Sequence, residues 1–226
     1  MTIEWFPGHM LTARRQAAEA LRKNDVVIEV LDARAPYSSC NPLVETLRRE
    51  TQRPALKILN KSDLADPVRT QQWLQFYNGK PGVRALSISC KKPQVHELGK
   101  FIWLTDTAGM LWPAIEQVAA LKLSITHSIG RNAYEETVAA SELAGYLLAN
   151  YPELLQKRFG ELKEAADAHA VISWVARKRG LVVKGGALDL EKAALVLLHE
   201  FRNGTLGRVS LEVPADLAER APLVRG

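Results

Sequence analysis

Four short apolar segments of the chain are each followed directly by polar, turn-forming residues. The segments with their endings are VVIEVLDAR (26–34), PALKILNKSD (54–63), VRALSISCKK (83–92) and FIWLTDTAGM (101–110). Near-continuous apolar runs are typical of strands buried on both faces, and helical patterns lie between most of them. This order predicts an α/β fold with an open, mainly parallel sheet. Ligands of such sheets bind outside the carboxyl ends of the strands, which is where these polar residues fall.

The second segment ends in Asn60-Lys61-Ser62-Asp63, a pattern that suits recognition of guanine. A single carboxylate can accept two hydrogen bonds, from the ring N1–H and the exocyclic amino group of guanine, and adenine offers no such pair of donors. We therefore assign Asp63 to the base, with Asn60 tying its loop to a neighbouring loop and the methylene stem of Lys61 lying over the base. The alternative is an ordinary turn in which Ser62 or Asp63 caps the next helix.

The third and fourth segments carry motifs that gain meaning beside a guanine site. In Ser89-Cys90-Lys91, a turn of small residues lets a backbone N–H approach the base carbonyl, and Ser89 would brace the loop. In DTAG (106–109), Asp106 would hold Mg²⁺ through water, and the Gly109 N–H would meet a γ-phosphate where no side chain fits. Each motif is weak alone, and its position directly after an apolar segment is what gives it value.

Together, NKSD, SCK and DTAG resemble the guanine-specificity motif, the second base-contacting motif and the Mg²⁺/γ-phosphate motif of the P-loop GTPases. The base motifs come before DTAG here, which is the order of the circularly permuted GTPases. The resemblance is to the ribosome biogenesis GTPase A family in particular, and it runs through WFPGHM (5–10), DARAPYSSCNP (32–42), DTAGMLWP (106–113), LKLSITHSI (121–129) and FRNGTLGRVSLE (201–212). It implies a protein that binds GTP and GDP, hydrolyses GTP with Mg²⁺ and assists assembly of the large ribosomal subunit.

The resemblance also implies a catalytic role for His9. Family members carry a hydrophobic residue where Ras-like proteins place their water-orienting glutamine, and Met110 and Leu111 take that place here. The histidine of WFPGHM is regarded as the substitute, since a near-neutral imidazole can hold the attacking water. The alternative for His9 is that it caps or packs at the start of the helix that follows. For Asp32 and Arg34 we expect a solvated or loop-bracing ion pair and assign no chemistry.

The chain departs from this family at the phosphate loop. A P-loop requires GxxxxGK[ST], and the only Gly-Lys pairs, at 79–80 and 99–100, are followed by Pro and Phe. In the permuted order the loop belongs between SCK and DTAG, where only the fourteen residues 92–105 lie. We infer that a segment is missing near residues 92–95, either unobserved or deleted, and we make GTP hydrolysis conditional on it. If the chain is continuous there, the alternative is a nucleotide-independent RNA-binding protein on a degenerate GTPase scaffold.

From residue 113 onwards the pattern changes to helices. The segment DLEKAALVLLHEFRNG (189–204) offers Asp189 as N-cap, an apolar stripe and Gly204 as stop. The sequence therefore predicts a GTPase domain over residues 1–112 and a smaller all-helical domain over residues 113–226. The basic cluster ARKRG (176–180) with Lys184 is either a solvated helix end or, by resemblance, a contact to ribosomal RNA. Four further basic residues could extend that footprint: Arg14, Arg15, Arg22 and Lys23.

Composition sets looser bounds. The 30 basic and 25 acidic residues give a formal net charge of +5, which mildly favours a polyanionic partner such as RNA. Two cysteines, Cys40 and Cys90, make neither a disulfide framework nor a cysteine metal cluster. The N-terminus has no long apolar stretch, so we expect no signal peptide or membrane span and a location in the reducing cytoplasm. We also expect the protein to be a monomer. The absence of GxGxxG makes a Rossmann-type oxidoreductase a poor interpretation.

Overall fold

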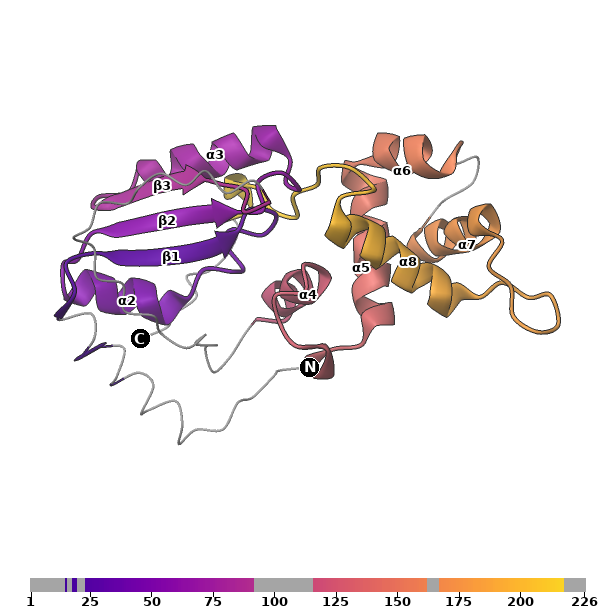
Figure 1. Ribbon diagram of the computed structural model, residues 1–226, viewed down its shortest axis with the longest axis horizontal. Helices are drawn as coiled ribbons and strands as arrows, with labels where there is room; N and C mark the ends of the chain where they lie inside the picture. The colour runs from indigo at the N-terminus through magenta and orange to yellow at the C-terminus, as the bar shows by residue number, and fades with distance from the viewer. Residues whose placement is uncertain (1–14, 16–17, 20–22, 92–115, 162–166, 218–226) are drawn as a thin grey trace. The chain divides into compact units, whose positions relative to one another are not determined.

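The computed structural model describes residues 15, 18–19, 23–91, 116–161 and 167–217 (Figure 1). The chain divides into two compact units, which we call unit 1 (Met1–Gln117 with Glu212–Gly226) and unit 2 (Val118–Leu211). The predicted boundary between residues 112 and 113 lies outside the described residues, and the segment from Glu212 onward groups with unit 1. Within the described ranges, no helix is both long and apolar enough to cross a membrane.

Unit 1 contains a three-stranded parallel sheet in the order β1-β2-β3. The strands are β1 (Val27–Asp32), β2 (Ala55–Asn60) and β3 (Val83–Ser87). Asp32 is the register partner of Asn60, and Leu59 is the partner of Ser87, so the carboxyl ends of the strands meet at one edge. The predicted α/β fold with a parallel sheet is confirmed. The fourth apolar segment, 101–110, lies outside the described residues.

Two capped helices connect the strands of unit 1, α2 (Pro42–Glu50) and α3 (Pro67–Asn78). The side chain of Asn41 accepts a hydrogen bond from the Leu43 N–H at 2.9 Å, and that of Asp66 accepts one from Val68 at 2.8 Å. In both helices a proline follows the cap, where its fixed φ suits the first turn. The sequence therefore sets both helix starts locally. The side chains that the helices bury against the sheet include Leu47, Trp73 and Tyr77.

Both described helices pack on the same face of the sheet. Val27 and Leu31 are buried on that face, whereas Ile28 and Val30, which point to the other face, are exposed. The apolar run of β1 predicts burial on both faces, and among the described residues only one face is covered. The reason is that α2 and α3 both contribute to the core on the Leu31 side.

The chain returns to unit 1 at Glu212 after passing through unit 2. The buried carboxylate of Glu212 accepts hydrogen bonds from the backbone N–H of Tyr37 at 2.7 Å and from the N–H and hydroxyl of Ser38. The Trp73 indole N–H donates to the Glu212 carbonyl at 3.1 Å. Unit 1 is thus assembled from two segments that are distant in the sequence.

Unit 2 is helical in its described part. Its helices are α4 (Gln117–Ile125, of which the first residue belongs to unit 1), α5 (Glu136–Asn150), α6 (Pro152–Phe159), α7 (Ala168–Arg179) and α8 (Leu190–Asn203). The prediction for α8 is confirmed, because Asp189 caps its start and Gly204 ends it in a left-handed conformation (φ 80°). The predicted apolar stripe is core, with Leu197, Leu198 and Phe201 almost fully buried.

Candidate functional site

The NKSD and SCK motifs lie side by side at the carboxyl end of the sheet. The Ser62 backbone N–H donates to the Ile88 carbonyl at 3.0 Å, and the Ser62 hydroxyl donates to the same carbonyl at 2.8 Å. The Ile88 N–H in turn donates to the Leu59 carbonyl at 2.9 Å. The turn after β2 and the turn after β3 are therefore joined by main-chain and hydroxyl hydrogen bonds, as two halves of one site require.

Asp63 sits between the two motifs. The Ser89 hydroxyl donates to Asp63 Oδ1 at 2.8 Å, and the Lys91 ammonium lies 3.1 Å from Oδ2. Partial burial raises the pKa of the Asp63 carboxyl, but the Ser89 hydrogen bond and the Lys91 charge outweigh it, so the pKa lies below its ordinary value. The side chain of Asp63 is 30% exposed and that of Lys91 64% exposed. Asp63 is thus an ionised acceptor that a ligand can reach.

The capping alternative for this loop is wrong. Helix α3 begins at Pro67, and its N-cap is Asp66, which accepts hydrogen bonds from Val68 and Arg69. Neither Ser62 nor Asp63 supplies that cap. The carboxylate of Asp63 is directed instead to Ser89 and Lys91 of the neighbouring turn.

Asn60 and Lys61 form a bridge to the end of β1. The Asn60 carbonyl accepts a hydrogen bond from the Ala33 N–H at 2.8 Å, while its side-chain oxygen accepts the Lys61 N–H at 2.7 Å. The Lys61 ammonium lies 2.9 Å from Asp32 Oδ2. Lys61 has a left-handed backbone (φ 61°), an uncommon conformation for a residue with a side chain. The described contacts fix the Lys61 amine at the sheet edge, and the proposed position of its stem over a base remains a prediction.

The predicted ion pair of Asp32 and Arg34 is confirmed. Arg34 donates from Nε to Oδ1 of Asp32 at 2.9 Å and from a terminal nitrogen to Oδ2 at 2.7 Å. Burial raises the pKa of the Asp32 carboxyl, and the guanidinium of Arg34 with the ammonium of Lys61 more than offsets it, leaving that pKa lowered. Both members of the pair are buried, so it braces the loop after β1 rather than meeting solvent. The ion pair between Asp32 and Lys61 was not predicted from the sequence. The signal for it is that Asp32 and Asn60 end two adjacent parallel strands, which brings the following residue Lys61 close to Asp32.

The remaining predicted residues are placed as follows. Cys90 is an exposed free thiol in the turn between Ser89 and Lys91. His9, Asp106 and Gly109 lie outside the described residues, as does the interval 92–95 where a missing segment is inferred. The structure therefore describes the base half of the predicted site. A partly exposed carboxylate braced by a hydroxyl can accept two hydrogen bonds from guanine, provided that the base shares Oδ2 with Lys91 or displaces that ammonium.

Comparison with known proteins places this geometry in context. No family model matches the chain. A protein of Mus musculus named mitochondrial ribosome-associated GTPase 1 is 40% identical, with 92% of this chain and 89% of the relative covered. Ribosome biogenesis GTPase A of Bacillus cereus is 28% identical, with 97% of each chain covered. The GDP-bound YlqF of Thermotoga maritima has a TM-score of 0.60 at 23% identity, covering 89% of this chain and all of that one, and shows the same fold.

These alignments are longer than the chain. The alignment to the Bacillus cereus relative spans 288 positions against 226 residues here, which leaves at least 62 positions without a residue of this chain. The relative from Mus musculus aligns over 299 positions. The chain thus retains nearly the whole span of its relatives while lacking residues within that span.

Proposed function

Because the chain belongs to the ribosome biogenesis GTPase A family, we propose that it binds GTP and GDP, hydrolyses GTP and assists assembly of the large ribosomal subunit. The observation that carries this proposal is the Asp63 carboxylate, held ionised and accessible between the turns that follow β2 and β3. In this role Asp63 accepts both donors of guanine, and Ser89 fixes the direction of its carboxylate. The backbone of the Ser89–Lys91 turn meets the base carbonyl.

The phosphate half of the site rests on residues outside the described ranges. We assign the γ-phosphate contact to the Gly109 N–H, the attacking water to His9 and a Mg²⁺ contact to Asp106. A carboxylate oxygen is the donor type that Mg²⁺ takes in nucleotide sites, and the ion would neutralise charge on the phosphates. A phosphate loop is also needed, and the 226 residues contain no GxxxxGK[ST]. The alignments show that relatives have residues that this chain lacks, and we propose that a phosphate loop is among them. GTP hydrolysis is therefore conditional on a phosphate loop that the 226 residues do not contain.

Binding to ribosomes would use the basic residues of both units. We propose that the protein acts as a monomer in the cytoplasm and contacts ribosomal RNA of the large subunit. The described positive charges available for this include Arg15, Lys23, Arg177 and Lys184. Co-sedimentation with large subunits should weaken steeply with salt, since each phosphate contact releases counterions.

A calorimetric titration of the purified chain with GDP, ADP and guanosine tests the nucleotide proposal. Binding of GDP without binding of ADP supports the base site. Tighter binding of GDP than of guanosine shows that a phosphate site is present, whereas equal affinities show that it is lacking and contradict GTP hydrolysis by this chain. Failure to bind any guanine compound, with subunit binding intact, favours the nucleotide-independent RNA-binding alternative.

A further inference from the structure

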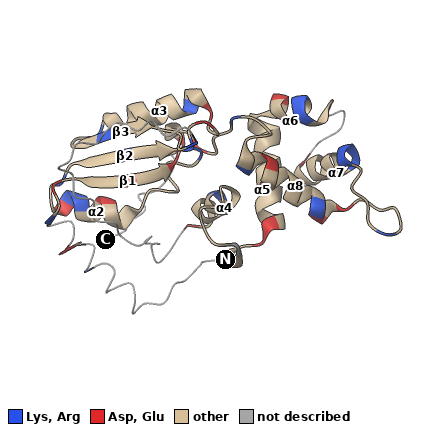
Figure 2. Ribbon diagram, viewed as in Figure 1, with Lys and Arg blue, Asp and Glu red and all other residues tan. Residues whose placement is uncertain are grey.

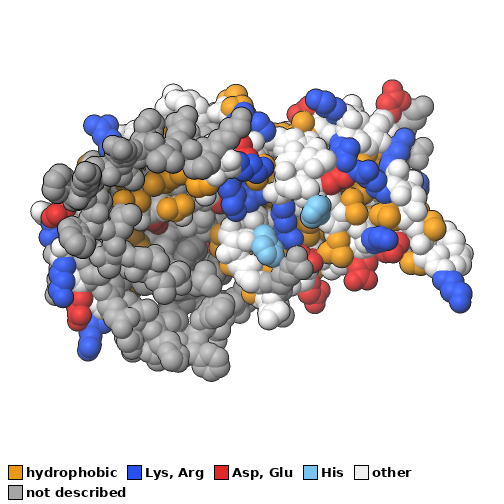
Figure 3. Space-filling view, in the orientation of Figure 1, with side chains coloured by type: hydrophobic (Ala, Val, Ile, Leu, Met, Phe, Trp, Pro, Cys, Tyr) orange, Lys and Arg blue, Asp and Glu red, His pale blue; other side chains and the backbone are white. Residues whose placement is uncertain are grey.

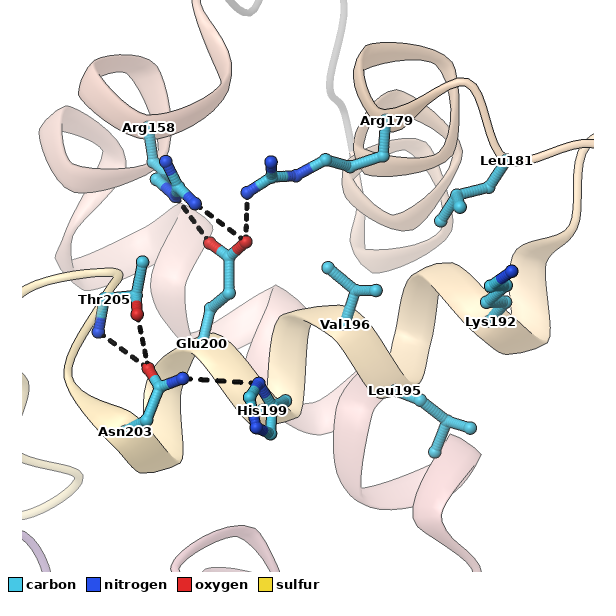
Figure 4. A pocket seen from close by; sticks show the side chains of 10 residues that line it. All are labelled: Arg158, Arg179, Leu181, Lys192, Leu195, Val196, His199, Glu200, Asn203 and Thr205. Atoms are coloured by element: carbon cyan, nitrogen blue, oxygen red, sulfur yellow. Dashed lines mark hydrogen bonds and ion pairs between the residues drawn. The ribbon is translucent and has the colours of Figure 1, made fainter.

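A groove of about 610 Å³ lies on unit 2 where α6, α7 and α8 meet (Figure 4). Arg158 comes from α6, Arg179 from α7, and Lys192 and Glu200 from α8, while Leu181 and Leu195 form part of an apolar side. Basic and hydrophobic side chains also lie close together over the helices of unit 2 in the space-filling view (Figure 3). We call this feature the α6–α8 groove. It is separate from the nucleotide site, whose described residues all belong to unit 1.

One buried carboxylate holds two guanidinium groups in this groove. Arg158 donates to Glu200 Oε2 at 2.6 Å and to Oε1 at 3.1 Å, and Arg179 also donates to Oε1. The side chain of Glu200 is only 8% exposed, while those of Arg158 and Arg179 are 33% and 37% exposed. The guanidinium carbon of Arg179 also lies 5.8 Å from the centre of the Phe159 ring. The buried carboxylate of Glu200 thus fixes the two guanidinium groups, and about a third of each arginine side chain remains exposed to solvent.

The contacts to Glu200 leave part of each guanidinium available. They use Nε and Nη2 of Arg158 and Nη2 of Arg179. Within the described part of the chain, no hydrogen bond engages Nη1 of Arg158 or Nε and Nη1 of Arg179. The residues that line the groove include three positive charges, on Arg158, Arg179 and Lys192, and one negative charge, on Glu200, so the groove carries about two net positive charges. Paired planar forks of N–H donors with excess positive charge suit a phosphate group.

The apolar side of the groove indicates which phosphate-bearing ligand fits. Leu181, Leu195 and Val196 line it beside the cations, and Leu195 is exposed. A single-stranded nucleic acid offers both chemistries at once, a phosphate for the arginines and a ribose or base face for apolar side chains.

We propose that the α6–α8 groove binds one backbone phosphate of single-stranded RNA between Arg158 and Arg179, with the adjoining nucleoside on Leu195 and Val196. The identity of the partner as RNA rests on the proposed function, and the site itself rests on the geometry. Glu200 is a positioning residue that orients the two arginines. Arg177 and Lys178, which neighbour Arg179 in the sequence, do not line the groove, so they contribute charge without this contact. Figure 2 shows basic residues in blue on α7.

A matched pair of variants in α6 tests the arginine contact. Arg158→Gln and Lys157→Gln remove the same charge from neighbouring exposed positions, and only Arg158 lines the groove. Fluorescence anisotropy with a short labelled single-stranded RNA should show about a tenfold loss for Arg158→Gln, because a hydrogen bond to a charged group is lost. The Lys157→Gln control should lose less than about twofold. Equal losses in the two variants would overturn the groove proposal.

For Glu200→Gln, the positioning role and simple charge attraction predict opposite changes in RNA affinity. The substitution removes a negative charge and so makes the groove more positive, and a surface that attracts RNA by charge alone would then bind it more tightly. A positioned arginine pair should instead bind RNA about threefold more weakly, with circular dichroism confirming that the helices are retained. If Glu200→Gln binds RNA as well as or better than the parent, the positioning role is wrong. Arg158→Lys keeps the charge without the planar fork, and it should weaken binding even if Glu200→Gln does not fold.

Binding measurements on the parent protein distinguish failure of the groove proposal from failure of the proposed function in ribosome assembly. A parent that binds neither RNA nor large subunits contradicts the proposed function. A parent that binds both, with Arg158→Gln unchanged, contradicts the groove alone. Polyglutamate at the same salt concentration distinguishes an acidic protein partner, since binding as tight as that of RNA would overturn an RNA site. Free phosphate should compete only at much higher concentration, because it lacks the nucleoside contact.

Discussion

Two carboxylates of this protein, Asp63 in unit 1 and Glu200 in unit 2, are each held by basic side chains, yet they differ in burial. Asp63 keeps nearly a third of its side chain exposed and meets one flexible, largely exposed ammonium, whereas Glu200 is almost fully buried between two guanidinium groups. Replacing the basic partner of Asp63 costs little free energy because the pair is partly exposed, whereas replacing a partner of the buried Glu200 costs much more. This difference supports our two proposals, that Asp63 recognises a ligand and that Glu200 positions the arginines that bind one.

The largest expected effect is on nucleotide binding by Asp63→Ala. Both donors of guanine lose their shared acceptor, and hydrogen bonds to a charged partner are each worth about 1.5–3 kcal/mol, so GDP affinity should fall at least about tenfold. Asp63→Asn should shift preference towards xanthine nucleotides, whose additional carbonyl accepts from an amide. Calorimetry measures both. Asp66→Asn is the matched control, because it removes one charge from the same loop while retaining a side chain that can cap α3.

GDP binding by Asp63→Ala that is as tight as that of the parent would remove the base assignment. It would also remove the contrast between the two carboxylates, because neither would then recognise a ligand.

The next effect is on stability, and it should be large only for Glu200. Glu200→Ala leaves two partly buried guanidinium groups without their acceptor. Breaking a buried pair costs about 3–5 kcal/mol, and because both arginines are about one-third exposed we expect roughly 2 kcal/mol here. Urea unfolding of Glu200→Ala and Asp63→Ala side by side should show a loss for the former and about 0.5 kcal/mol or less for the latter. Similar losses would mean that burial does not separate their roles.

The smallest effect concerns Lys91. Its exposed ion pair with Asp63 should contribute less than about 1 kcal/mol to stability. Since the pKa of Asp63 is lowered in the folded protein, this contribution is present above the ordinary carboxyl range and is lost as pH falls through the lowered pKa. In Lys91→Ala the Asp63 pKa should rise towards its ordinary value, which a carboxyl-detected NMR titration measures. An unchanged pKa would assign the shift to the hydrogen bonds that Asp63 accepts from Ser89 and from the backbone.

Local chemistry explains what could be predicted from the sequence. The ends of α8 depend on Asp189 and Gly204, which act on backbone groups within a few residues, and both predictions are confirmed. The parallel sheet follows from apolar runs separated by helical patterns. The ion pair of Asp32 and Arg34 joins residues two apart. In each case the physical determinant lies within a short stretch of chain.

Contacts between distant residues could not be predicted in the same way. Lys61 reaches Asp32 because of the register of β1 and β2, and Arg158 meets Glu200 only once α6 and α8 have packed. The contiguous cluster at residues 176–180 suggested where RNA would bind, but of its three cations only Arg179 lines the groove. His9, Asp106 and Gly109 stay predictions, because they lie outside the described residues.

The return of the chain at Glu212 bears on the order in which the protein can fold during its own synthesis. Unit 2 is one continuous stretch, residues 118–211, and all of it has been translated before Glu212 is added. Until then the hydroxyl of Ser38 and two backbone N–H groups of the first-made unit lack their buried acceptor. Translation adds about 5–20 residues per second, so several seconds separate the synthesis of Ser38 from that of Glu212, and unit 1 lacks these contacts throughout that interval. The unit that is begun first is therefore finished last.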